Sequence, residues 1–129
     1  MKSHELAKAH FDKLVSSPEG REEVSKFDAI MQFDLKDDDS FYIEVKKGKV
    51  SVTKGKAPAE SQNVMTFMTD QATVREIFQK GQLYPGLADF MFEGKLWFKG
   101  AKSDGPKDGW IAGEKTTTAW AAKLLRMHV

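Results

Sequence analysis

The sequence has 129 residues, of which 40% are hydrophobic and 30% charged, and its formal net charge is +1. These values predict one globular domain over residues 1–129 with a single core. The absence of cysteine excludes disulfides, thiolate metal sites and cysteine nucleophiles. Because the sequence has no basic stripe, no membrane-length apolar run and no apolar leader, we expect a cytoplasmic protein that does not bind nucleic acid.

The first half of the sequence changes from helical to strand periodicity. Apolar residues recur at helical spacing over residues 3–17, with Ser3 as a candidate N-cap, and Pro18–Gly20 interrupts this pattern. Alternating apolar residues then predict three strands, which form a meander with an acidic turn and a Lys-Gly hairpin. The strands are residues 27–35, residues 41–46 and a segment around Val50 and Val52.

The second half returns to mixed elements. A polar loop leads to a strand over residues 63–69, and Asp70 is a candidate N-cap for a helix that ends near Lys80. The remaining predicted elements are a short helix around Leu87–Met91, a strand at 95–99, a Gly-rich polar segment at 101–116 and a helix at 117–127. This order predicts an α+β fold, in which one mainly antiparallel sheet carries helices packed on one face.

Few residues favour catalysis or metal binding. His4 and His10 lie about 240° apart around a helix, so they cannot share a metal as an i, i+4 pair would. Asp37–Asp39 lacks the spacing of a calcium loop and is interpreted as a solvated turn. Asp28 and Asp34 fall on the polar side of their strand. We therefore expect no catalytic residue, no metal and no cofactor.

Large, deformable apolar side chains are abundant. The sequence holds nine Phe, three Trp and six Met residues. Such residues either fill an ordinary core or line a cavity that adapts to an apolar ligand.

Two loops are basic at their tips, Lys46–Lys49 and Lys54–Lys56. They are interpreted either as exposed turns or as points of transient contact with an anionic membrane surface.

Four segments in order resemble the sterol carrier protein type two (sterol-transfer) domain family: FDAIMQFDLKDDDSFYIEVKKGKVSV, NVMTFMTDQATVREIFQKGQLYP, FMFEGKLWFKG and TAWAAKLLRM. The resemblance spans residues 27–127, and the Gly94-Lys95-Leu96…Lys99-Gly100 bracket is its most specific part. It implies a five-stranded sheet with helices over one face and an apolar lipid tunnel between the two layers.

The resemblance also implies non-enzymatic binding and transfer of a lipid: a fatty acid, fatty acyl-CoA, sterol or phospholipid. Carried over position by position, the implied tunnel residues are Phe33, Ile43, Phe78, Phe90, Met91, Leu96, Phe98, Trp120 and Leu124. The chain departs from the family in two ways. Residues 101–116 form an inserted loop before the closing helix, and the peroxisomal address of many eukaryotic carriers is missing.

Two other functions remain open. In the first, the chain is an accessory module for a lipid-pathway enzyme, or a homodimer. It would associate through an outward apolar set made of Met65, Phe67 and Trp97, with Ile30 as a further candidate. We expect Trp97 to be covered, either by the inserted segment through Trp110 or by a second subunit.

In the second of these other functions, the chain is a small enzyme with an apolar cone, which requires a carboxylate or tyrosine inside the cavity. Tyr84 is not assigned to either face.

Overall fold

The computed structural model describes residues 2–61, 64–79, 93–99 and 117–127, and within these the side chains of Phe98, Lys99, residues 117–119, Ala122 and Arg126 are not described. The elements, in chain order, are α1 (Ser3–Val15), α2 (Pro18–Val24), β1 (Ala29–Leu35), β2 (Phe41–Lys46), β3 (Lys49–Lys54), β4 (Val64–Thr69), α3 (Gln71–Phe78), β5 (Trp97–Lys99) and α5 (Thr117–Arg126).

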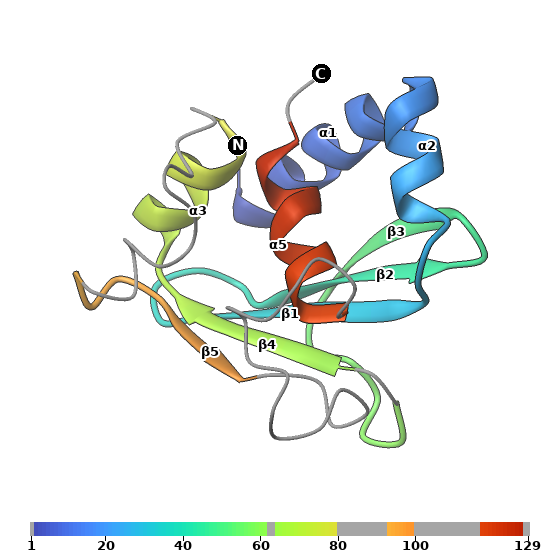
Figure 1. Ribbon diagram of the computed structural model, residues 1–129. Coiled ribbons are helices and arrows are strands. Elements are labelled where there is room, and N and C mark those ends of the chain that lie inside the picture. The colour runs from blue at the N-terminus through green and yellow to red at the C-terminus, as the bar shows by residue number, and fades with distance from the viewer. Residues whose placement is uncertain (1, 62–63, 80–92, 100–116, 128–129) are drawn as a thin grey trace.

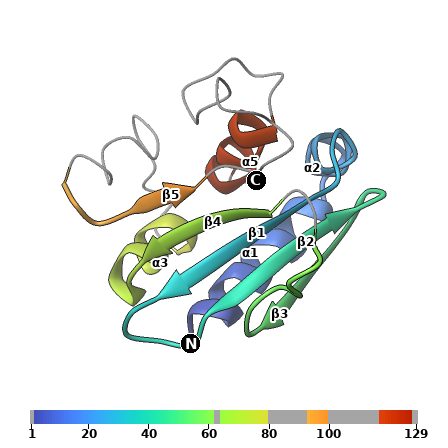
Figure 2. The same cartoon turned by 90° about the horizontal axis from the view of Figure 1, so that it is seen from below.

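The sheet has the order β3-β2-β1-β4-β5. Four strands of six or seven residues form its body, and the three-residue β5 joins the edge beside β4. Three ladders are antiparallel, whereas β4 runs parallel to β1, so the sheet is mixed. The loop after β3 makes the parallel pairing possible by passing across one face of the sheet, where the Ala57 N–H donates to Gln32 Oε1 at 2.9 Å (Figure 2).

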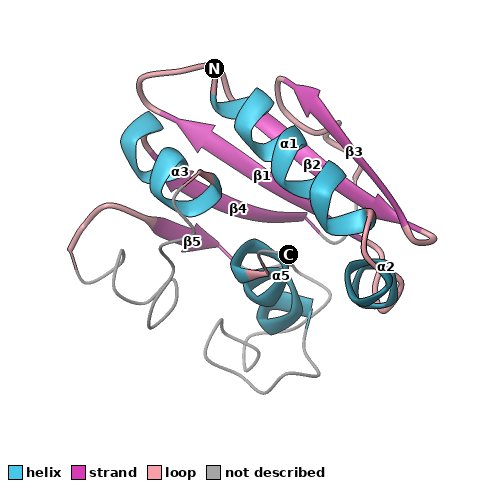
Figure 3. Cartoon of the chain, turned by 90° about the horizontal axis from the view of Figure 1, so that it is seen from above, coloured by secondary structure: helices cyan, strands magenta, loops and turns pink. Residues whose placement is uncertain are grey.

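The helices α1, α2, α3 and α5 all lie on the other face of the sheet (Figures 1 and 3). This arrangement confirms the predicted α+β class with helices packed on one face. The core between the layers buries alternate residues of each long strand, because side chains point to opposite faces along a strand. In β1 these residues are Ala29, Met31 and Phe33, with exposures of 4%, 0% and 0%.

The N-terminal helical region differs from the prediction in two details. Lys2 rather than Ser3 is the N-cap of α1, and its N–H donates to Glu5 Oε1 at 2.8 Å. Pro18 does not end the helical region, because it occupies the first turn of α2, where its missing N–H costs nothing. Ser17 caps α2 by accepting the N–H of Gly20 at 3.0 Å.

Gly20 determines how closely α2 approaches the end of α1. A Cβ at this position would overlap the backbone carbonyl of Leu14. We expect Gly20→Ala to destabilise the fold by about 3 kcal/mol, the upper part of the range for overpacking. Glu22→Ala, at an exposed position of the same helix, is the control and should change the unfolding free energy by less than about 0.5 kcal/mol. Urea unfolding measures both, and equal effects would contradict the close-approach argument.

The predicted Lys47-Gly48 hairpin is confirmed. Lys46 and Lys49 are the last register partners of β2 and β3, so the loop has two residues. Both have positive φ, 51° for Lys47 and 78° for Gly48, as in a type I′ turn.

Candidate functional site

An aromatic stack crosses three strands on the helix-covered face. The Phe33 ring lies parallel to Phe41 of β2 at a centroid distance of 5.0 Å and an angle of 6°. On its other side Phe33 lies 4.9 Å from Phe67 of β4 at 20°. The rings meet because Phe33 is the register partner of both Phe41 and Phe67. The sheet therefore presents a broad aromatic floor.

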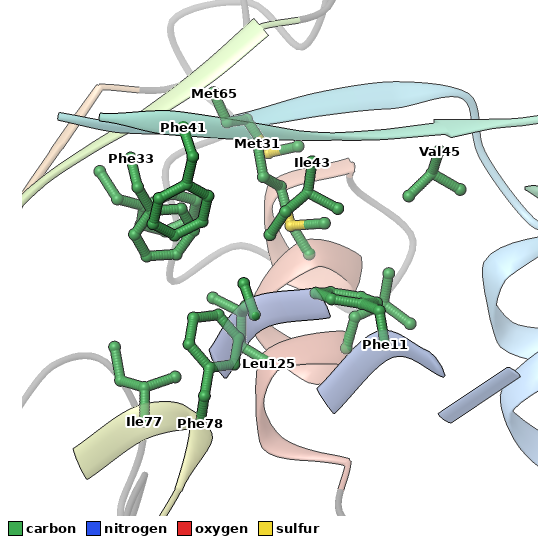
Figure 4. Packing of buried hydrophobic residues seen from close by; sticks show 14 of the residues in the cluster. Phe11, Met31, Phe33, Phe41, Ile43, Val45, Met65, Ile77, Phe78 and Leu125 are labelled. Atoms are coloured by element: carbon green, nitrogen blue, oxygen red, sulfur yellow. The ribbon is translucent and has the colours of Figure 1, made fainter. Parts of the chain in front are cut away.

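Methionines extend this floor along the same strands. Met31 and Met65 are register partners in the parallel β1–β4 ladder, and both are 0% exposed. Ile43 of β2 pairs with Met31 from the other side and is also 0% exposed. Figure 4 shows these side chains between the sheet and the helices. Methionine can change rotamer at small cost, so this part of the floor can adapt its shape.

The helices supply the opposite wall. Phe78 of α3 tilts against Phe33 at 5.7 Å, and Phe11 of α1 lies 6.4 Å from Phe78 (Figure 4). Helix α5 contributes Trp120, Leu124 and Leu125, with exposures of 1%, 0% and 0%. Three helices and the sheet thus enclose one continuous apolar layer.

Polar contacts fix α5 to the first two helices. The Trp120 indole N–H donates to the Glu23 carbonyl at 2.6 Å, and the Glu23 carboxylate pairs with Lys123 at 3.4 Å and Lys26 at 3.0 Å. His10 of α1 donates from Nε2 to the Leu124 carbonyl at 3.0 Å, because a carbonyl oxygen can only accept. The buried groups His10 and Glu23 thus hold α5 in place.

The sequence-predicted tunnel residues gather in this layer as far as they are described. Phe33, Ile43, Leu96, Trp120 and Leu124 are 0–1% exposed and Phe78 is 6% exposed, all within one cluster. Phe90, Met91 and the side chain of Phe98 lie outside the described residues, as do Tyr84 and Trp110.

The predicted outward set is wrong for two of its three members. Met65 and Phe67 are 0% and 1% exposed and belong to the core. Both phases of the VMTFMT strand carry apolar residues, so alternation alone could not choose between them. The parallel register with β1 decides the phase, since it sets Met65 beside Met31 and Phe67 beside Phe33.

Trp97 is on the outward face as predicted, but its neighbour there is Met68. The two residues are register partners, with exposures of 61% and 39%. The cover expected over Trp97 stays a prediction, because residues 101–116 lie outside the described residues and the structure contains a single subunit. Ile30, the further candidate, is 7% exposed and stands outside the core cluster.

Sequence reasoning missed several residues of the layer. Phe41 has the same alternation phase as Ile43, so the pattern contained the signal for it. Phe11 lies on the apolar stripe of α1, which the pattern also showed. Met65 and Phe67 had no usable signal, because only the strand pairing defines their face.

The acidic turn Asp37–Asp39 anchors two helices. Asp38 Oδ2 accepts the Ser3 N–H of α1 at 3.0 Å and the Gln71 side-chain N–H of α3 at 3.2 Å. Asp37 Oδ1 accepts the Gln71 backbone N–H at 2.8 Å. Hydrogen bonding from Ser3, reinforced by Asp39 and Gln71, holds the pKa of Asp38 well below its ordinary value. The turn is therefore a structural connector between helix N-termini.

We expect Asp38→Asn to lower the unfolding free energy at pH 7 by about 1 kcal/mol, as for a lost helix cap. A carboxyl whose pKa is depressed by folding stabilises the fold above its unfolded pKa of about 3.9 and loses this effect as the pH falls. The difference between wild type and variant should thus shrink below about pH 4. Asp39→Asn, which removes only the exposed pairs with Lys2 and Lys54, is the control and should cost less than about 0.5 kcal/mol. A pH-independent difference for Asp38→Asn would contradict the assignment.

Two arrangements are absent from the residues that the structure describes, a metal-binding cluster and a membrane-spanning helix. Within them no group of three or more His, Cys, Asp or Glu side chains is arranged to hold a metal ion. No helix in this part of the chain is long and apolar enough to cross a membrane.

The fold and the site define an α+β domain in which helices cover one face of a mixed sheet and an apolar layer separates the two. Residues 9–101 match the SCP-2 sterol transfer family, and the chain belongs to this family. Domains of this family are in general non-catalytic domains that bind and transfer lipids. A search of curated proteins gives no match to the sequence.

Three solved structures share the fold. The structure titled "UbiJ-SCP2 Ubiquinone synthesis protein" is similar with a TM-score of 0.60 and 14% identity over 95% of this chain and 94% of that one. A crystal structure of sterol carrier protein 2 is similar with a TM-score of 0.55 and 18% identity, over 100% of this chain and 98% of that one. Apo sterol carrier protein 2 from Yarrowia lipolytica is similar with a TM-score of 0.51 and 21% identity, over 70% of this chain and 82% of that one. At these identities the likeness shows the fold alone.

Proposed function

We propose that this chain binds and transfers a lipid without catalysing a reaction, and that the apolar part of the lipid enters the layer between the sheet and the helices. The observation that carries the proposal is the layer itself. Side chains from strands and helices far apart in sequence meet there, and the chain belongs to a lipid-transfer family. The binding residues we propose are Phe33, Ile43, Phe78, Leu96, Trp120 and Leu124, together with Met31 and Met65; Phe90, Met91 and Phe98 remain proposed on the family resemblance.

The energetics favour a ligand with a long hydrocarbon part. At ~0.8 kcal/mol per buried CH₂, a long acyl chain gains on the order of 10 kcal/mol before the costs of association and ordering. The described layer is closed by its own side chains, since most of them are 0–1% exposed. A lipid must therefore displace side chains, and the methionines on the floor are the ones that change rotamer most easily. This is how the lipid tunnel expected from the sequence would form.

The chemistry of the layer leaves the ligand class broad. A fatty acid, fatty acyl-CoA, sterol or phospholipid each offers an apolar part of sufficient length. Of the buried titratable groups near the layer, Glu23 is paired with lysines and His10 contacts α5. We therefore place the polar head of the lipid at the edge of the layer. The cytoplasmic location expected from the sequence is part of this proposal.

Organic extraction of the native protein followed by mass spectrometry tests the proposal, together with displacement of a bound fluorescent fatty acid. We expect a co-purified lipid and saturable displacement. Met65→Trp adds volume inside the layer, whereas Met68→Trp makes the same change three residues along β4 on the outward face. The first variant should retain less lipid and the second should behave as wild type, with circular dichroism confirming that both are folded. No lipid and no displacement with wild-type protein would refute the function.

A second candidate is an accessory or interaction module, and the exposed Met68–Trp97 pair favours it. Exposed large apolar pairs on an edge strand are a common feature of protein contacts. The similar UbiJ-SCP2 structure is titled a ubiquinone synthesis protein, which is compatible with a pathway role. Size-exclusion chromatography with light scattering tests self-association. A wild-type dimer that Trp97→Ala converts to a monomer without loss of bound lipid would support this candidate. A strictly monomeric wild-type protein would exclude the homodimer and leave a different protein as the partner.

A further inference from the structure

The tip of the β2–β3 hairpin carries a residue that its backbone disfavours. Lys47 has a φ of 51°, and it is the one non-glycine residue with positive φ among those the structure describes. An L-residue with a Cβ is strained there, and Asn, Asp or Gly is the usual choice in a type I′ turn. Asparagine at position 47 would make a more stable hairpin, so folding does not explain the lysine.

The neighbouring pair is also unfavourable for folding. Lys46 and Lys49 lie directly opposite each other in the register, and like charges in this position repel. Both alternate with residues that pack toward the core, Val45 and Val50, so they share the outward face. Within the described part of the chain, Lys46, Lys47 and Lys49 form no ion pair that would offset the repulsion.

The hairpin tip lies against the C-terminal end of α2 (Figures 1 and 3). A Cβ at Gly48 would lie 3.1 Å from Ser25 Oγ, and the adjacent Lys26 extends the basic cluster. Two nearby carboxylates are already engaged. Asp28 Oδ1 accepts the Lys47 backbone N–H at 2.9 Å, and Glu23 pairs with Lys26 and Lys123. The hydrogen bond leaves the charge of Asp28 in place and Glu23 balances Lys26, so the excess of positive charge at this end comes from the tip lysines Lys46, Lys47 and Lys49.

We propose that this end of the molecule, formed by Lys46, Lys47, Lys49 and Lys26, docks on an anionic lipid bilayer. Two departures from local folding rules occur at one tip, and among the described residues no ion pair offsets the charge of its three lysines, which favours a contact outside the chain. A projecting hairpin with several lysines suits a flat anionic surface, which requires charge but no shaped pocket. The inference extends the proposed lipid transfer, because α5 is attached at Glu23 beside this end, and docking would bring the α5 side of the apolar layer close to the membrane.

Co-sedimentation with vesicles tests the docking. Full-length protein is mixed with sucrose-loaded vesicles of phosphatidylcholine, with or without 30% phosphatidylserine. We expect binding only to the anionic vesicles, and its loss at high salt. Each lysine removed from the contact should weaken the partition coefficient about fivefold. Lys47→Asn should therefore bind about fivefold more weakly while its thermal midpoint equals or exceeds that of wild type, which separates docking from folding.

Lys56→Asn is the matched control. It removes the same charge from the other basic loop, which follows β3 at the opposite end of the β2–β3 pair. It should change binding by less than twofold. Equal losses in the two variants would show a general charge effect and overturn the proposal. Wild-type binding to an RNA oligonucleotide but not to vesicles would overturn it as well. Vesicle binding needs no lipid inside the protein. Vesicle co-sedimentation can therefore fail while lipid extraction succeeds, and lipid extraction can fail while vesicle co-sedimentation succeeds.

Discussion

Phe33→Ala is expected to remove about 4 kcal/mol from the free energy of unfolding, within the range for truncating a buried phenylalanine. Phe33 is 0% exposed and contacts the rings of Phe41, Phe67 and Phe78. Truncation removes its transfer free energy and leaves a cavity under the helices that three rigid rings cannot fill. Domains of this size have a total stability of about 5–15 kcal/mol, so the variant should be close to the limit of folding.

Thermal and urea unfolding measure this effect, and the midpoint should fall by roughly 15 °C. Met68→Ala is the matched control, because it truncates a side chain of the same sheet on the opposite face, where Met68 is 39% exposed. It should cost less than about 0.5 kcal/mol. Added fatty acid should raise the midpoint of Phe33→Ala in proportion to the logarithm of its concentration, provided that the layer binds lipid. Similar losses in both variants would contradict the assignment of the two faces.

Trp120→Ala is expected to cost about 3–5 kcal/mol and to act first on α5. Trp120 is 1% exposed, lies 5.4 Å from the Phe27 ring and donates to the Glu23 carbonyl. The variant loses this anchor between α5 and α2, while His10 and Leu124 remain as the second attachment. We therefore expect native-state hydrogen exchange in α5 to accelerate more than exchange in β1.

Trp120→Phe separates the hydrogen bond from the packing. It keeps an aromatic ring but removes the indole N–H, and the Glu23 carbonyl retains the Lys26 N–H at 3.3 Å. This variant should cost only about 1 kcal/mol. Equal acceleration of exchange in α5 and β1 for Trp120→Ala would show that α5 does not open as a separate unit. Faster release of the fluorescent fatty acid from Trp120→Ala than from Trp120→Phe would connect α5 to lipid exchange.

The surface turns illustrate how far local sequence can be interpreted. The Lys47-Gly48 hairpin was predictable because glycine at that position and alternation on both sides define a two-residue loop. The capping of α3 by Asp70 was predictable too, and the carboxylate accepts the Thr73 N–H at 2.8 Å. The role of Asp38 was not, because its partners Ser3 and Gln71 lie 35 and 33 residues away in sequence.

The sequence by itself determined the class of the fold, most element positions and the inward phase of β1 and β2. In those strands one phase is apolar and the other mostly polar, so burial has a clear preference. The tertiary structure alone decided the face of β4, where both phases carry apolar residues and the parallel pairing with β1 turns Met65 and Phe67 inward. It also decided which groups hold α5, since His10 contacts Leu124, and Glu23 contacts Trp120, only when α1 and α2 pack against α5. Periodicity reports which side of an element is apolar, but the partner of that side is set by long-range packing.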